Sequence, residues 1–290
     1  MMSNGYRQVL LNMRPANSAA ALCGRLLLLL LLLATGNAAA ALRVITLSPH
    51  ATELVYFAGG QGQLVGVSNF SDFPPAVSSL PRIGDATGID RERILMLQPD
   101  LAVVWSGGGS SSDLQWLREQ QIRLFESDPQ NLQAIADDIL ALGILLGTPE
   151  HAGRSHAAFT RRLQQLRSLA RHPAPELRAI HLVWQHPLML LTDEELVSQA
   201  LALCGITNPL HLPGHKLATV TREYLWNIDA DAIVIDDQGF IDLPQDDATV
   251  IRADSRRLHR PSPRLLDAAL ELCREILLHA KDLPGEAAGR

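Results

Sequence analysis

The sequence predicts an α/β protein in which two lobes are joined by one long helix. Two observations lead to this prediction. Short β-branched or apolar runs alternate with segments whose apolar residues recur every three or four positions, and this happens in both halves of the chain. One helical segment of roughly 20 residues separates the halves. Because β-α-β alternation is typical of a mainly parallel sheet with helices on both faces, we expect such a sheet in each lobe.

The first lobe, residues 41–148, shows this alternation along its whole length. Its expected strands cover residues 43–47, 64–67, 101–105 and 122–125. Thr52 is expected to cap a helix that runs through Phe57 and ends at Gly59-Gly60. Further helices are expected around 94–97, around 114–117 and over 132–146, with residues 107–112 as a flexible loop.

The joining segment, residues 149–172, is distinguished by one apolar stripe. No glycine or proline follows Gly153 until Pro173 stops the segment. A helix of this kind is about 30 Å long at 1.5 Å per residue, so it can join two lobes rigidly. The stripe consists of Ala152, Phe159, Leu163, Leu166 and Leu169.

The second lobe, residues 173–282, repeats the alternation and leaves a short tail, residues 283–290. Its expected strands are 179–184, 232–236 and 250–251. Its expected helices are 194–203, stopped by Gly205, a helix capped by Thr221 that runs to Trp226, and 265–279.

Residues 1–40 have the pattern of a secretory signal. Arginines, the last of them Arg25, precede an apolar run from Leu26 to Leu33, and alanines follow around Ala40. The apolar run is far shorter than the roughly 20 residues that a bilayer span needs. We therefore expect cleavage near Ala40 and a mature, monomeric protein in the periplasm.

Composition and motifs argue against several classes of protein. A net charge of −6 without a Lys/Arg-rich cluster argues against a nucleic acid or an anionic lipid as partner. Gly60-Gln61-Gly62 lies between an expected helix and a strand, whereas a dinucleotide loop runs from strand to helix. The glycines at 107–109 lack the lysine of a phosphate cradle, and no G-x-S-x-G elbow occurs. We expect no enzymatic activity.

Histidines and cysteines leave alternatives open. A zinc or manganese chaperone would need at least three clustered imidazoles and carboxylates, and the histidine spacing of a metal site is absent. Cys204 and Cys273, both in the mature chain, could form a disulfide in an oxidising compartment or remain two separate buried thiols. The histidines expected in loops or just after strands are His50, His186, His211, His215 and His259.

Several ordered motifs resemble one family. The sequence is similar to the periplasmic cobalamin-binding proteins, the helical-backbone substrate-binding proteins of ABC importers, from about residue 42 to 280. The segments that carry the resemblance are Val44-Ile45-Thr46-Leu47-Ser48-Pro49, Thr52-Glu53-Leu54, Gly66-Val67-Ser68, Ser71-Asp72, Pro74-Pro75, Glu92-Arg93-Ile94, Pro99-Asp100-Leu101, Leu203-Cys204-Gly205, Val220-Thr221-Arg222-Glu223 and Ser262-Pro263-Arg264.

The resemblance implies two Rossmann-like lobes bridged by a single long helix, the class III periplasmic binding protein fold, with a ligand held between the lobes. It implies a corrinoid, cobalamin first, as the transported ligand, with haem or a ferric siderophore as the alternative. It implies no cofactor, and an ABC importer permease dimer with its ATPase subunits as partner. It also implies that Cys204 and Cys273 form a disulfide.

The ligand-binding residues that the resemblance implies are only partly aromatic here. Phe70 stands where these proteins have a tyrosine, and Trp105 matches a tryptophan. Ala86, Met189 and Leu217 replace a tryptophan, a phenylalanine and a tryptophan. Because aromatic faces bury a large area at a small entropic cost, these losses should reshape recognition, although Met and Leu keep the wall apolar.

Charged residues complete the expected site. The resemblance places Arg256 and Arg260 by the cleft, where the family has an aspartate and an arginine, and two cations there could favour an anionic ligand such as haem. It also implies that Glu92 and Glu223, one in each lobe, dock onto arginines of the permease; without it both would be ordinary surface carboxylates.

Overall fold

The computed structural model describes residues 42–170, 177–237 and 249–279. The expected signal, residues 1–40, and the tail, residues 283–290, lie outside these residues, as does the end of the joining segment. Residues from Leu42 onward cluster as one unit. In the part of the chain that the structure describes, no helix combines the length and the apolar character needed to cross a membrane.

The N-terminal lobe is built on a four-stranded parallel sheet in the order β2-β1-β5-β6. Successive residues of the central strands face opposite sides: Val44 packs into one core cluster and Ile45 into another. The strands are β1 Val44–Thr46, β2 Leu64–Val67, β5 Leu101–Trp105 and β6 Arg123–Ser127. All four strands were predicted.

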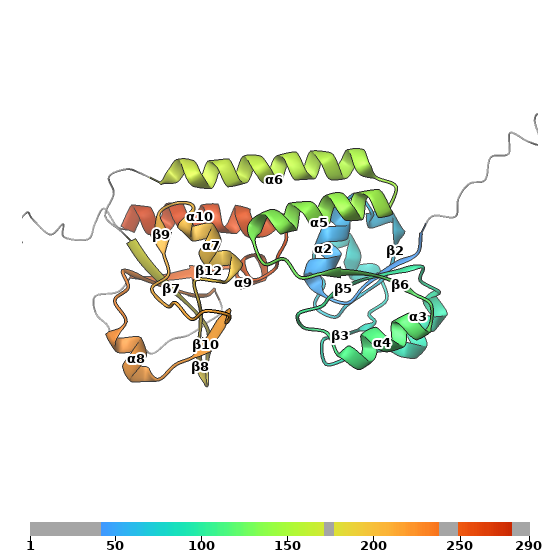
Figure 1. Ribbon diagram of the computed structural model, residues 1–290, viewed down its shortest axis with the longest axis horizontal. Coiled ribbons are helices and arrows are strands. Elements are labelled where there is room, and N and C mark those ends of the chain that lie inside the picture. Colours follow the sequence, from blue (N-terminus) through green and yellow to red (C-terminus); the bar gives the residue numbers. More distant parts are fainter. Residues whose placement is uncertain (1–41, 171–176, 238–248, 280–290) are drawn as a thin grey trace, which may run out of the picture. The chain divides into compact units, whose positions relative to one another are not determined.

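Helices cover both faces of this sheet (Figure 1). The apolar faces of α2 and α5 belong to the first core cluster, and those of α3 and α4 to the second. A short hairpin, β3 Gly84–Asp85 with β4 Gly88–Ile89, was not predicted. The helices are α2 Pro49–Phe57, α3 Arg91–Leu97, α4 Ser111–Glu119 and α5 Leu132–Leu145, with single turns η1 Gln61–Gln63 and η2 Pro75–Ser79.

The cap of α2 differs from the prediction. Ser48, not Thr52, caps this helix, because its hydroxyl accepts a hydrogen bond from the amide of Ala51 at 3.3 Å. Pro49 follows in the first turn, where its fixed φ suits a helix and its missing N–H costs nothing. Thr52 lies one turn further on, and its hydroxyl instead shares hydrogen bonds with the hydroxyls of Thr46 and Ser71.

The C-terminal lobe has a mixed sheet in the order β10-β8-β7-β11-β12, with β9 also paired to β7. The strands β7, β11 and β12 were predicted and run parallel, as expected. The short parallel strand β9 and the antiparallel strands β8 and β10 were not predicted. The strands are β7 Leu177–Gln185, β8 Leu188–Leu191, β9 Ile206–Thr207, β10 Leu217–Thr219, β11 Ala232–Asp236 and β12 Thr249–Ala253. The helices are α7 Leu196–Ala202, α8 Arg222–Asn227, α9 Ser255–Leu258 and α10 Pro263–His279.

Helix α6, Pro149–Leu169, runs along α5 of the first lobe and α10 of the second (Figure 1). Its buried side chains are Ala152, Phe159, Leu163 and Leu166, all members of the predicted stripe. They belong to a single core cluster that includes residues of both lobes. The two lobes therefore share one apolar core through this helix.

A disulfide links Cys204, just after α7, to Cys273 in α10, with their Cα atoms 6.4 Å apart. Both side chains are buried. The expected pairing is confirmed, and the alternative of two separate thiols is wrong. In the chain-entropy model, closing a loop of this length stabilises the fold by roughly 4 kcal/mol.

Loss of this bond should lower stability measurably. Cys204→Ser should reduce the melting temperature by about 5–15 °C, because the unfolded chain regains the entropy that the disulfide removes. Differential scanning calorimetry of the wild-type protein and the variant measures the shift. Thiol titration of the unfolded, unreduced wild-type mature protein should find no free cysteine, and two reactive thiols would contradict the assignment.

Candidate ligand-binding site

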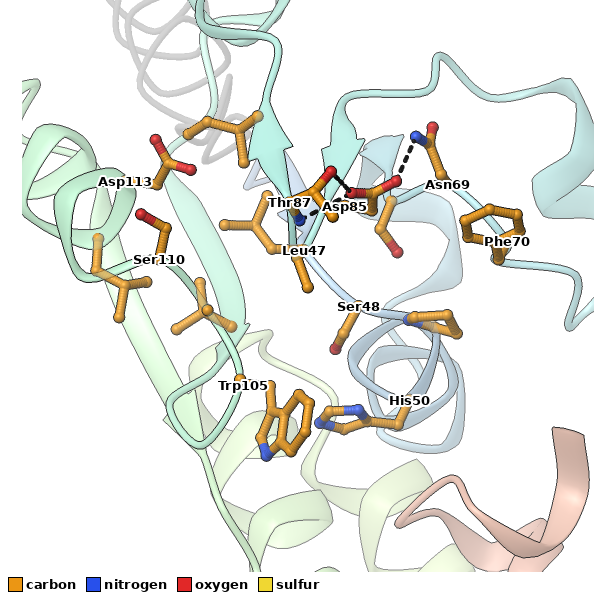
Figure 2. A pocket seen from close by; sticks show the side chains of 18 of the residues that line it. Leu47, Ser48, His50, Asn69, Phe70, Asp85, Thr87, Trp105, Ser110 and Asp113 are labelled. Carbon is orange, nitrogen blue, oxygen red and sulfur yellow. Dashed lines mark hydrogen bonds between the residues drawn. The ribbon is translucent and has the colours of Figure 1, made fainter. Parts of the chain in front are cut away.

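A cavity of about 440 Å³ opens where β1 and β5 of the N-terminal lobe end (Figure 2). This is the edge of an open α/β sheet at which ligands commonly bind, because the loops after the strands meet there. Leu47, Val104 and Leu114 make part of an apolar wall. Phe70 and Trp105, two of the residues expected to contact the ligand, border the cavity.

Trp105 is the last residue of β5, and its side chain is 39% exposed. The loop that follows explains its position. A Cβ atom on Gly108 would lie 2.0 Å from the ring atom Cζ3 of Trp105, and one on Gly107 would lie 2.8 Å from its Nε1. Glycine therefore occupies these positions because the indole packs directly on the loop backbone. Within the glycine run 107–109, which lacks the lysine of a phosphate-binding loop, Gly107 and Gly108 thus provide the backbone surface on which the Trp105 indole packs.

His50 lies on the other side of this indole, in the first turn of α2. Its ring meets that of Trp105 nearly at right angles, with the centroids 5.7 Å apart (Figure 2). Burial, and secondarily the charge of Arg260, lower the pKa of His50 to about 4. The imidazole is therefore neutral at neutral pH, and its Nε2 has no hydrogen-bond partner in the described structure.

Phe70 is held at the rim in a conformation that bulky residues rarely adopt. Its φ is 62°, in the left-handed region, and the residue is 77% exposed. Hydrogen bonds fix the backbone on both sides of it: Arg260 donates to the Phe70 carbonyl at 3.2 Å, and Arg82 donates to the carbonyls of Ser68 and Ser71 at 3.1 and 2.8 Å. The fold thus constrains the loop to present an exposed ring, which is the kind of strain that collects at binding sites.

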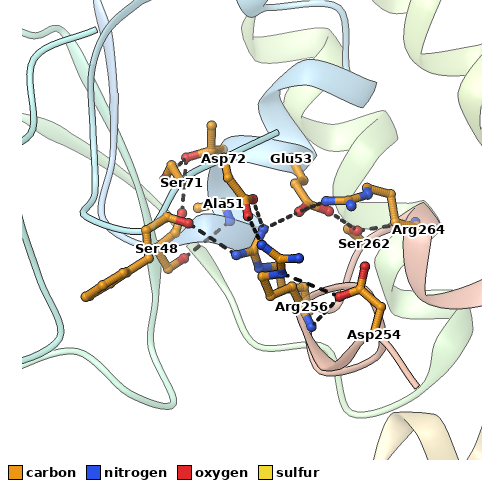
Figure 3. A network of polar contacts seen from close by, with 12 residues as sticks. Ser48, Ala51, Glu53, Ser71, Asp72, Asp254, Arg256, Ser262 and Arg264 are labelled. Carbon is orange, nitrogen blue, oxygen red and sulfur yellow. Dashed lines mark hydrogen bonds and ion pairs between the residues drawn. The ribbon is translucent and has the colours of Figure 1, made fainter. Parts of the chain in front are cut away.

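Behind this loop, Glu53 of α2 is completely buried and receives hydrogen bonds from the other lobe (Figure 3). Arg260 and Arg264 donate to its Oε1 at 2.9 and 2.8 Å, and the Ser262 hydroxyl donates to its Oε2. Arg260 also donates to Asp72. Partial burial alone would raise the pKa of Asp72, but the hydrogen bond and charge of Arg260 outweigh it and lower that pKa.

These contacts correct the expectation of two cations available at the cleft. Arg260 borders the cavity, but its side chain is only 12% exposed and its charge is balanced by Glu53 and Asp72. Arg256 is exposed and lies within 4 Å of two carboxylates, Asp72 at 3.8 Å and Asp254 at 3.6 Å. Carboxylates that the sequence pattern did not place nearby therefore compensate both arginines, and the site is not a positive patch.

A second cavity, of about 560 Å³, lies in the C-terminal lobe beside the ends of β7 and β11. His186 and Asp236 border it, and His259 borders both cavities. Met189 and Leu217, expected to form this wall, border neither cavity. They lie on β8 and β10, the two antiparallel strands that extend the sheet beyond β7. Ala86 does border the first cavity.

Trp184 is the residue of this second cavity that sequence reasoning missed. It precedes the last residue of β7, and the sequence pattern predicts it only as the last residue of the strand over 179–184. A usable signal was present: like Trp105, it is a large ring at the carboxyl end of a strand in an α/β lobe, where ligand-binding side chains collect.

The histidines among the described residues do not assemble a metal site. Within residues 42–170, 177–237 and 249–279, no three His, Cys, Asp or Glu side chains converge as metal ligands. His211 pairs with Asp193 at 2.7 Å, and His259 shares a hydrogen bond with the buried His181. The structure thus gives no support to the metal-chaperone alternative.

Glu92 and Glu223, the expected docking residues, are both exposed. Each lies in the first turn of a helix, Glu92 in α3 of the N-terminal lobe and Glu223 in α8 of the C-terminal lobe. Neither borders the cavities, so a partner could contact them without touching the ligand.

Two α/β lobes that share a core through one helix, with a cavity at each sheet edge, define a ligand-binding protein of the bridged two-lobe class. A family model described as periplasmic binding protein matches residues 44–254. The chain therefore belongs to the periplasmic binding protein family.

Individual relatives agree. The chain is 34% identical over 246 residues to a vitamin B12-binding protein of Yersinia pestis (strain Pestoides F), covering 82% of this chain and 88% of the relative. It resembles the crystal structure of the periplasmic vitamin B12-binding protein BtuF of Vibrio cholerae with a TM-score of 0.73 and 30% identity, covering 82% and 98% of the two chains. The periplasmic heme-binding protein RhuT from Roseiflexus sp. RS-1 shares the fold, with a TM-score of 0.74 and 22% identity over 83% and 99%.

The packing of the Trp105 ring against Gly108 can be tested without a ligand. Gly108→Ala should cost about 1–3 kcal/mol of unfolding free energy, because the new methyl group overlaps the indole. In a Trp105→Ala background the same change should cost almost nothing. Urea unfolding of the wild type, the two single variants and the double variant gives the coupling energy between positions 105 and 108.

Gly62→Ala is the matched control, because a Cβ at Gly62 meets nothing within 4 Å. If Gly108→Ala lowers the unfolding free energy equally with and without the Trp105 ring, the indole does not pack against this glycine.

Proposed function

We propose that this protein captures a corrinoid, with cobalamin as the favoured ligand, and delivers it to the permease of an ABC importer. The observation that carries the proposal is the largely apolar cavity beside β1 and β5, with Trp105 and Phe70 presented at its edge. A flat macrocycle buries a large apolar area against such rings, and polar groups at the rim orient it. The vitamin B12-binding names of relatives at 30% and 34% identity support the same ligand class.

Charge distinguishes the corrinoid from the haem alternative. Haem carries two carboxylates, which are costly to bury unless cations pair with them, whereas the amide side chains of a corrin are neutral hydrogen-bonding groups. Since Arg260 is paired with Glu53 and Asp72, adding carboxylates beside it would bring like charges together. The site therefore favours the neutral-rimmed macrocycle over haem and over an anionic ferric chelate.

Calorimetric titration tests this ligand assignment. Cyanocobalamin and cobinamide should bind with one-to-one stoichiometry and more tightly than haemin or a ferric siderophore. Trp105→Ala should weaken corrinoid binding by about 1–3 kcal/mol, the usual effect of truncating a ring that contacts a ligand. Far-UV dichroism serves as the folding control. Tighter binding of haemin than of either corrinoid would refute the assignment.

Delivery is proposed to depend on Glu92 and Glu223. Both carboxylates are exposed, lie in separate lobes and stand apart from the cavities. Arginine forks on a permease dimer match carboxylate geometry, and two such contacts would fix the orientation of the loaded protein. Residues 1–40 are proposed to act as the export signal that places the protein in the periplasm.

The double change Glu92→Arg and Glu223→Arg should reduce cobalamin uptake by about tenfold or more, because two attractive contacts become repulsive. The dissociation constant should remain unchanged. Uptake is measured in cells in which this protein is the only cobalamin-binding protein. Glu119→Arg with Glu275→Arg provides a control of equal charge change at other exposed sites. Normal uptake by the first double variant would show that both docking residues are ordinary surface carboxylates.

A further inference from the structure

Trp184 is a large, exposed ring whose orientation is fixed. It is 61% exposed near the end of β7, and its indole N–H donates a hydrogen bond to the His186 carbonyl at 2.9 Å. An exposed tryptophan alone needs no explanation, since single apolar side chains are common on surfaces. A ring whose only polar atom is satisfied by the backbone, however, can contact a ligand through its exposed surface while losing little entropy on binding.

The surroundings of Trp184 indicate a ligand rather than bulk solvent. The residue borders the 560 Å³ cavity of the C-terminal lobe together with His259, and His259 also borders the cavity that contains Trp105. The two cavities therefore meet at one side chain. Asp236 and Ser255, which are hydrogen-bonded to each other, add polar groups to the wall.

Trp184 and Met189 are neighbours in the sheet. They pair across the antiparallel strands β7 and β8, so their side chains project from the same face, but only Trp184 borders the cavity. A ring on β7 can therefore supply the aromatic surface that residues 189 and 217 do not supply.

We propose that Trp184 is the ring with which the C-terminal lobe contacts the transported macrocycle, opposite Trp105 of the N-terminal lobe. This inference rests on the proposed function, because it names the C-terminal contact of the same site. Asp236 and Ser255 beside Trp184 would form hydrogen bonds with the amides at the rim of the ligand. The ring and these polar groups together would select a planar ligand with a polar edge.

Titration of matched variants tests this inference. Trp184→Ala should weaken cyanocobalamin binding about tenfold, as expected when a ligand-contacting ring is truncated. Trp184→Phe should restore most of the affinity, because a ring still fills the position. Trp226→Ala removes a tryptophan of α8 that borders neither cavity, and should leave the dissociation constant unchanged. Quenching of tryptophan fluorescence by the bound corrin gives a second readout, which should be smaller in Trp184→Ala.

The outcomes separate this inference from the proposed function. If wild-type protein binds cyanocobalamin and a folded Trp184→Ala variant binds it within twofold of wild type, the inference is overturned and the proposed function stands. If wild-type protein binds haemin in place of corrinoids, the proposed ligand is wrong, and the same variants titrated with haemin decide the role of Trp184. No binding of either macrocycle would overturn both.

Discussion

The arrangement of the site depends on one buried carboxylate, Glu53. Its side chain lies in the N-terminal lobe, and Arg260, Ser262 and Arg264, which satisfy its oxygens, come from the segment that enters α10 in the C-terminal lobe. A buried charge is tolerated only with such partners, and removing one partner of a buried ion pair typically costs about 3–5 kcal/mol. The two lobes are thus tied together directly behind the cavity.

This network also determines what the ligand meets. Arg260, drawn toward Glu53 and Asp72, donates to the carbonyl of Phe70 and so helps hold that ring at the rim. The same pairing neutralises the cation closest to the cavity. The site therefore presents rings and an apolar wall rather than net positive charge, which suits a neutral-rimmed macrocycle better than a carboxylate-bearing one.

Helix α6 adds a second constraint on motion. Phe159, Leu163 and Leu166 belong to a core that includes residues of both lobes, so a large rotation of one lobe against the other would expose apolar surface. Because the Glu53 network also ties the lobes together, recognition of the ligand must depend mainly on side chains that are already in position. The main one is Trp105, which packs against Gly107 and Gly108. Preorganisation of this kind avoids the entropic cost of ordering rings upon binding.

Sequence reasoning predicted most helices and strands, because long periodic segments and buried apolar runs carry a strong signal. It missed β8 and β10, which lie outside the parallel β-α-β alternation from which the other strands were predicted, and it missed the two-residue strands β3, β4 and β9. It could not see that Glu53 compensates Arg260, since 207 residues separate them and only tertiary structure brings them together. The disulfide followed from the resemblance, not from spacing. Trp184 was overlooked because, in the sequence alone, a tryptophan at the end of a predicted strand is as compatible with a buried core position as with a ligand contact.

A crystal structure of the protein grown with cyanocobalamin would show whether one planar macrocycle is held between rings of the two lobes. We expect a single corrin beside the carboxyl ends of β5 and β7, with Trp105 and Trp184 both in van der Waals contact with it and the Glu53 network intact. A corrin bound elsewhere, or one that touches neither indole, would refute this mode of binding.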